Sequence, residues 1–187
     1  GLHTHADAQR RVVGEREIDA KGLGLRIALG RDLAEVYHSL GEVNLYREVE
    51  GTVHARALRI SQDFFEKSAS LRTILLQSAN GDDRRNHQRD LARSHGYLGD
   101  LYLAQGLIAK AEKSYKDSKD LRQELFLTNR MDPEYRVQYA RGLGNFGSLE
   151  RNYTGNMQRA VEMLMEAEEI QEGLTRDFPE VKTFHSD

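Results

Sequence analysis

Residues 90–102 read DLARSHGYLGDLY, and the frame of this stretch occurs three times in the chain. An earlier copy has Asp32-Leu33-Ala34 followed by Leu40-Gly41, and a later, degenerate copy has Gln138-Tyr139-Ala140 followed by Phe146-Gly147. In each copy the second large apolar residue follows the first by seven residues, which is two helical turns. Repetition of a phrase with helical period is typical of stacked helical hairpins.

Apolar residues around the second copy predict one such hairpin. Leu91, Leu98 and Tyr102 share one face of a helix, and Gly106 can take the left-handed conformation that ends it. The sequence therefore predicts an all-α fold, an α-solenoid of three helical hairpins behind an N-terminal helix. The predicted units are an N-terminal segment that ends a preceding repeat (1–31), a long first repeat (32–81), a second repeat (82–131), a third repeat (132–180) and the start of a truncated repeat (181–187).

The second hairpin resembles the tetratricopeptide repeat family. It has the family's order of large, small, aromatic, turn glycine, small and aromatic residues at Leu98-Gly99, Tyr102, Gly106, Ala111 and Tyr115. Ser118 stands where the family usually has alanine. The resemblance is to the longer, bacterial-type repeats, and it implies a right-handed superhelix. The repeat phase at the two ends indicates a fragment of a larger protein.

The third repeat differs from the second in length. Gly99 to Ala111 spans twelve residues, whereas Gly147 to Ala160 spans thirteen. We therefore expect one extra residue in the turn around Tyr153 to Met157.

Composition excludes several classes of protein. The net charge is −3, so no global field attracts nucleic acid, and without cysteine there is no thiolate nucleophile or sulfur-bound zinc. No apolar run approaches the roughly 20 residues of a membrane span. The sequence predicts a cytoplasmic protein with no membrane partner and no cofactor.

Three motifs suggest chemistry that their context disfavours. Gly142 to Gly147 matches the G-x-G-x-x-G dinucleotide fingerprint, but a predicted helix runs through it in place of a strand-to-helix turn. The seven histidines lack metal-ligand spacing, and the one of most interest is His38, which the repeat register places on the inner helix surface. Glu162, Glu166 and Glu169 form a stripe typical of a solvated helix face. We expect it to match the charge of the preceding helix, through Lys113 with Glu162 and Lys119 with Glu168.

Arg84, Arg85, Arg89 and Arg93 form the best candidate for nucleic-acid binding. Basic side chains neutralise phosphates, and helical repeats can follow a strand. Asp82, Asp83 and Asp90 are interleaved with them, which favours a helix start of mixed charge. A nucleic-acid-binding array is therefore the alternative function, and the expected partner is a protein or peptide.

The resemblance implies that the first helices of the repeats bind that partner on the concave side. The implied peptide-binding residues are Glu35, His38, Glu42, Tyr46, Arg93, Tyr97, Asp100, Arg141, Asn145 and Asn152. Gly96 and Asp100, then Gly144 and Ser148, stand where chaperone-binding members have lysine and asparagine, which disfavours that role. The predicted function is a non-catalytic protein–protein interaction scaffold.

The C-terminal end of the array is predicted to support self-association. The last long helix carries Met163, Leu164, Ile170 and Leu174, and the chain stops before another helix would cover them. Repeat arrays bury each apolar face on a neighbouring unit. We therefore expect a homo-oligomer through this face, or a tail that folds back over it.

Overall fold

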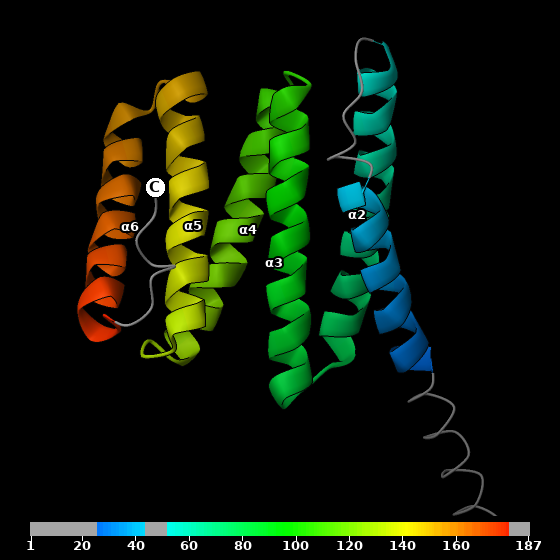
Figure 1. The fold of residues 1–187 in the computed structure, drawn as a ribbon, viewed down its shortest axis with the longest axis horizontal. Coiled ribbons are helices and arrows are strands. Elements are labelled where there is room, and N and C mark those ends of the chain that lie inside the picture. The colour runs from blue at the N-terminus through cyan, green and yellow to red at the C-terminus, as the bar shows by residue number, and fades with distance from the viewer. Residues whose placement is uncertain (1–25, 44–51, 180–187) are drawn as a thin grey trace, which may run out of the picture.

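The computed structural model describes residues 26–43 and 52–179, which are helical and without a strand (Figure 1). Residues 26–43 form one helical segment, named helix 26–43 below. The other helices are α2 (Thr52–Ser78), α3 (Gly81–Ala104), α4 (Ile108–Thr128), α5 (Pro133–Leu149), the π-helical η1 (Glu150–Thr154) and α6 (Met157–Asp177). The prediction of an all-α fold is confirmed. Tyr46 and the predicted segment 181–187 lie outside the described residues.

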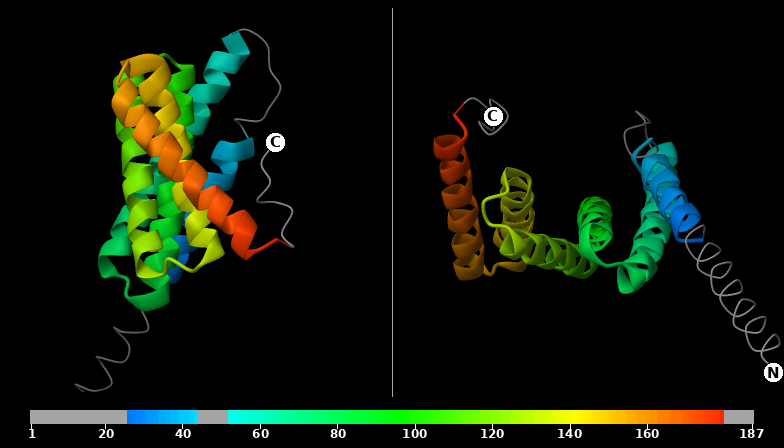
Figure 2. Two further views of the ribbon diagram at one scale, coloured as in Figure 1. Left: turned by 90° about the vertical axis from the view of Figure 1, so that its left-hand side faces the viewer. Right: turned by 90° about the horizontal axis from the view of Figure 1, so that it is seen from below.

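The helices pack in chain order as three antiparallel pairs. Hairpin 1 is helix 26–43 with α2, hairpin 2 is α3 with α4, and hairpin 3 is α5 with α6, and each helix contacts chiefly its neighbours in the chain. Seen from below, the pairs form an arc, with α3 and α5 on its inner side and α4 on its outer side (Figure 2). The first helices of hairpins 2 and 3 therefore border the concave side.

One contact recurs inside all three hairpins, between a glycine and a large side chain. A Cβ atom added at Gly99 would lie 2.5 Å from the Tyr115 ring, and one at Gly41 would lie 2.9 Å from the Phe65 ring. In hairpin 3 the same atom at Gly147 would lie 3.0 Å from Leu164. Only a glycine lets the two backbones approach this closely. The recurrence shows that the three hairpins share one register.

A second recurrent contact joins the two helices of hairpins 1 and 2. Ser68 Oγ donates to the carbonyl of Ala34 at 2.8 Å, and Ser118 Oγ donates to the carbonyl of Ala92 at 2.7 Å. Both serines are buried, so each hydroxyl needs a partner, and the carbonyl supplies it. Hairpin 3 has Ala167 at this position. This position of the repeat therefore holds either an alanine or a serine whose hydroxyl bonds to the facing helix.

The helix end between α3 and α4 has the expected glycine cap. Gly106 has a φ of 72°, in the left-handed region. Its N–H donates to the carbonyl of Leu103 at 2.9 Å, and the N–H of Leu107 donates to that of Tyr102 at 2.8 Å. This pair of bonds is a Schellman motif, which satisfies the last carbonyls of α3.

The extra residue of hairpin 3 lies in η1. Gly155, with a φ of 75°, ends this segment as Gly106 ends α3, and five residues separate each glycine from the next alanine, Ala111 or Ala160. The two turns are therefore equal in length, and the insertion is absorbed as a π-helical turn before Gly155. The prediction of a longer turn around Tyr153 to Met157 is wrong.

The ends of the array differ from the prediction. Met163 and Leu174 are buried, and Leu164 and Ile170 are half-buried within hairpin 3. Exposed large apolar side chains lie both on helix 26–43, including Leu33 and Val36, and on α6, including Val161 and Met165. Packing within hairpin 3 therefore covers Met163 and Leu174, and self-association through the C-terminal face stays a prediction.

Candidate functional site

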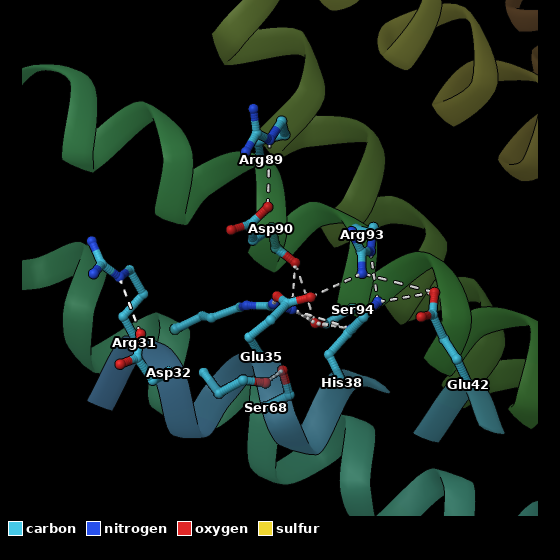
Figure 3. Close-up of polar contacts among 12 residues, drawn as sticks. Arg31, Asp32, Glu35, His38, Glu42, Ser68, Arg89, Asp90, Arg93 and Ser94 are labelled. Atoms are coloured by element: carbon cyan, nitrogen blue, oxygen red, sulfur yellow. Dashed lines mark hydrogen bonds and ion pairs between the residues drawn. The ribbon is translucent and has the colours of Figure 1, made fainter. Parts of the chain in front are cut away.

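A polar network lies where helix 26–43, α2 and α3 meet (Figure 3). Its centre is Arg72 of α2, whose side chain is only 3% exposed. Arg72 Nη2 donates to Glu35 Oε2 at 2.6 Å, and Nη1 donates to Ser94 Oγ at 2.6 Å and to the carbonyl of Asp90 at 3.1 Å. A buried guanidinium is costly unless acceptors surround it. Here a carboxylate, a hydroxyl and a carbonyl fill that role, and they tie hairpin 1 to hairpin 2.

His38 is fully buried beside Arg72. Arg93 Nε donates to His38 Nε2 at 2.6 Å, so that nitrogen is an acceptor. The other ring nitrogen, Nδ1, lies 3.2 Å from Arg72 Nη1 and 3.3 Å from Ser94 Oγ, and a neutral ring with Nε2 as acceptor has its proton on Nδ1, directed at the Ser94 hydroxyl. The ring also packs edge-on against Phe65 and Tyr97, with centroids 5.0 and 5.3 Å away. His38 is therefore a structural residue that no partner can reach.

The surroundings keep His38 neutral. Burial, and then the charges of Arg93 and Arg72, lower the pKa of His38 from its ordinary value of 6.5 to about 3. Glu42 Oε1 lies 3.4 Å from His38 Nε2, but a neutral ring that already accepts a hydrogen bond forms no ion pair with it. The charge partner of Glu42 is Arg93, at 3.8 Å.

The predicted peptide-binding residues of α3 are largely engaged within the chain. Arg93 contacts His38 and lies 3.5 Å from Glu35, and Tyr97 stacks on Phe65 with ring centroids 4.8 Å apart. Asp100 is exposed, although its carboxylate accepts a 2.5 Å hydrogen bond from Tyr115 Oη. Of the α3 candidates, only Asp100 is exposed.

The predicted residues of α5 and η1 are available. Arg141 is exposed and Asn145 is half-buried, and within the described part of the chain neither side chain makes a hydrogen bond or ion pair. A Cβ atom at Gly144, between them, would meet nothing within 4 Å. Asn152 of η1 is exposed and accepts a hydrogen bond from its neighbour Arg151 at 3.2 Å. The inner surface of α5 is therefore polar and open.

Arg122 of α4 occupies the place that Arg72 occupies in α2, fifty residues earlier. It is 5% exposed, and its Nε and Nη1 atoms have no hydrogen-bond partner among the described residues. Burial, and then the charge of Arg141, lower the pKa of Arg122 to about 10, while Asp100 opposes the shift. The sequence patterns gave neither Arg72 nor Arg122 a role. Arginines on the inner face of otherwise apolar helices were the signal that could have found them.

The four arginines of the predicted nucleic-acid cluster all have acceptors. Arg84 donates to the carbonyl of Leu76 at 2.9 Å, and Arg85 pairs with Asp82. Arg89 contacts Asp90 at 3.4 Å and Glu134 at 3.7 Å, and Arg93 belongs to the network around His38. The cluster is therefore balanced by acceptors of the same chain.

The predicted charge match between α4 and α6 is wrong. Lys113 pairs with Asp117, and Lys119 pairs with Asp120, at 2.7 and 2.8 Å within the same helix. In α6, Glu166 accepts a hydrogen bond from Tyr139 Oη at 2.9 Å. Lys113 and Asp117 are one helical turn apart, where side chains of one helix are close neighbours, and Lys119 and Asp120 are adjacent in the chain. Both lysines therefore pair within α4 and not with α6.

The other motifs hold no site in the structure. Gly142, Gly144 and Gly147 all lie inside α5, so their amides serve the helix and cannot cradle a pyrophosphate. Within residues 26–43 and 52–179, no group of three or more His, Cys, Asp or Glu could hold a metal ion. Nor does any helix in these ranges have the length and apolar character to cross a membrane.

Comparisons with known proteins do not add a relative. No protein family, characterised protein or solved structure matches the chain. The resemblance to tetratricopeptide repeats therefore stays a prediction, and the functional argument rests on the contacts described above.

Proposed function

We propose that this chain is a non-catalytic, cytoplasmic interaction scaffold, a tetratricopeptide-like superhelix that binds a peptide or partner protein along its concave side. The binding surface is centred on α5, with Arg141 and Asn145 as its principal residues. Asp100 and Asn152 border it. Glu35, His38, Glu42, Arg93 and Tyr97 are left out, because contacts within the chain use them.

One observation carries the proposal, the contrast between equivalent positions on α3 and α5. Arg93 and Arg141 occupy the same place in two successive repeats, as do Tyr97 and Asn145. The pair on α3 is engaged with hairpin 1, whereas the pair on α5 makes no hydrogen bond or ion pair to a described residue. A guanidinium and an amide that are polar, accessible and uncommitted suit recognition of a peptide backbone or acidic side chain.

Peptide selection tests this surface without a known partner. Binders are selected from a random peptide display library on immobilised chain, and their affinities are measured by fluorescence anisotropy. We expect Arg141→Ala combined with Asn145→Ala to weaken binding about 10-fold or more, which corresponds to about 1.4 kcal/mol. The matched control is Lys113→Ala on α4, an exposed residue whose pair, Asp117, lies on the same helix. Equal losses in the two variants, or none in either, would contradict the proposal.

A salt titration addresses the nucleic-acid alternative. Binding of single-stranded RNA through phosphates must weaken steeply as salt rises, because counterions are released. We expect no such binding, since the arginines at 84, 85, 89 and 93 already have acceptors. Tight binding at low salt that is lost at high salt, and lost in Arg85→Gln, would favour the alternative.

A further inference from the structure

We infer that the contact between hairpins 2 and 3 contains a binding site for a carboxylate group, with Arg122 as the residue that holds it. This inference rests on the proposed function, because the carboxylate belongs to the peptide or protein that lies along the concave side. The inference specifies what the partner must contain. The partner must present an acidic side chain or a free C-terminus near the middle of the array.

The chain itself shows what an arginine at this position requires. In hairpin 1, Arg72 binds Glu35, Ser94 and the carbonyl of Asp90, with His38 beside it. One repeat later, the residues at the places of Glu35, His38 and Ser94 are Arg93, Gly96 and Gly142. The carboxylate is replaced by a cation, and the two side chains beside the guanidinium are deleted. Arg122 thus keeps the position of Arg72 without its acceptors.

The two glycines border the guanidinium closely. A Cβ atom at Gly96 would lie 3.4 Å from Arg122 Nη2, and one at Gly142 would lie 3.2 Å from Arg122 Cδ. Nη1 is buried and finds no hydrogen-bond partner within residues 26–43 and 52–179. A carboxylate that enters over Gly96 can accept from Nη1 and Nη2 together, the bidentate geometry that arginine favours. An unpaired buried donor costs about 1–3 kcal/mol, so a ligand that pairs it recovers that free energy on binding.

The charges around Arg122 favour one carboxylate over a phosphate chain. Arg141 is a second cation close enough to lower the pKa of Arg122, and it is exposed. Asp100 also acts on Arg122, but its carboxylate is held by Tyr115 Oη. A polyphosphate would meet Asp100 at the same place and would find no further row of unpaired cations on α3.

The first experiment builds a carboxylate into the chain. Gly96→Asp places one beside Arg122 Nη2, and Gly96→Asn is the neutral control of the same size. We expect the melting temperature of the Asp variant to exceed that of the Asn variant by about 2–4 °C in a chain of this length. An Asp variant that melts at or below the Asn variant would overturn the site, because both replace the same glycine and only the charge differs.

The second experiment uses acetate as the probe. Thermal unfolding of the chain is compared in sodium acetate and in sodium chloride of equal ionic strength. We expect acetate to raise the melting temperature of the natural chain with saturation, and to leave Gly96→Asp, Gly96→Asn and Arg122→Met at their chloride values, because a side chain at position 96 fills the place of the acetate and Met removes the guanidinium. An acetate effect that is absent from the natural chain, or equal in all four proteins, overturns the inference.

The carboxylate site and the peptide surface on α5 can be refuted separately. If acetate has no specific effect but selected peptides still depend on Arg141 and Asn145, the carboxylate site is wrong and the proposed function stands. If acetate acts as expected but no selected peptide depends on those residues, the site stands and the peptide surface proposed on α5 is wrong.

Discussion

Arg72 and Arg122 lie at the same position of two successive hairpins. The hydrogen-bond acceptors that surround Arg72 are missing around Arg122. Arg72 has a carboxylate, a hydroxyl and a carbonyl within 3.1 Å, drawn from helix 26–43 and α3. Arg122 faces two glycines, and its Nε and Nη1 have no partner in the part of the chain that the structure describes. The backbone frame is shared, since both hairpins have the glycine–aromatic contact and the serine–carbonyl bond.

This contrast separates two uses of one buried charge. The first arginine is a connector, because its acceptors come from both hairpins that it joins. Arg122 is buried like Arg72 but lacks acceptors of this kind. Its unpaired donors therefore destabilise the free chain and are available to a ligand. Repeat proteins can thus keep their packing constant while the polar residues at each junction change role.

The largest expected effect is on stability in acid, and it tests the network around Arg72. The pKa of His38 in the folded chain is about 3, below the ordinary value of 6.5. As pH falls below 6.5, the unfolded chain binds the proton first, so stability is complete above that pH and is lost down to about pH 3. The free energy of unfolding should fall by up to about 1.4 kcal/mol per pH unit in this window.

His38→Gln provides the control for that titration. Burial also lowers the pKa of His87 and His95, so the variant should retain part of the slope in urea unfolding measured from pH 7 to pH 4. Identical slopes for the natural chain and His38→Gln would show that His38 does not stay neutral in the fold.

Arg72→Met should destabilise the chain by about 2–3 kcal/mol, because hydrogen bonds to a charged group are lost and buried acceptors remain. Urea unfolding measures the change. The comparison variant Glu35→Gln removes only one, half-exposed charge and should cost about 1 kcal/mol or less. If Arg72→Met unfolds at the natural urea concentration, Arg72 is not a connector.

Arg122→Met should leave stability unchanged or raise it by about 1 kcal/mol or more, the opposite of its counterpart in hairpin 1. An apolar side chain of similar length removes a desolvated charge that has unpaired donors. Arg141→Met, at an exposed position, should change stability by less than about 0.5 kcal/mol. A loss of 2 kcal/mol or so in Arg122→Met would end the contrast between the two arginines.

The smallest expected effect sharpens the contrast at the glycines. Gly96→Ser adds a hydroxyl near Arg122 Nη2, as Ser94 does for Arg72, whereas Gly144→Ser adds one where nothing lies within 4 Å. Both changes gain helix propensity, so their difference isolates the new hydrogen bond. We expect Gly96→Ser to be the more stable by about 0.5–1.5 kcal/mol in urea unfolding. Equal stability of the two serine variants would show that the hydroxyl does not reach the guanidinium.

Sequence patterns predicted the frame of this protein because the frame depends on local periodicity. The repeated phrase predicted helical hairpins, the alignment of Gly41, Gly99 and Gly147 corresponds to one contact in all three, and Gly106 ends α3 in the left-handed conformation. These features follow from spacing along a helix and from the special freedom of glycine. The extra residue of hairpin 3 was counted correctly but misplaced. Residue spacing along the chain does not show whether an inserted residue lengthens the turn or forms a π-helical turn in the helix before it.

The candidate site needed the tertiary structure. His38, Arg93 and Tyr97 were assigned to a binding face by register, and the structure shows them used for packing between hairpins. Arg141 and Asn145 were assigned by the same reasoning and remain open.

The sequence by itself determined that the chain forms helical hairpins in one shared register, because apolar period and turn glycines act within about twenty residues. Only the tertiary structure decided which arginine is satisfied. The partners of Arg72 lie 37 residues before it and 22 after it, on two other helices. Whether such a guanidinium connects hairpins or awaits a ligand depends on side chains that meet only after the hairpins pack.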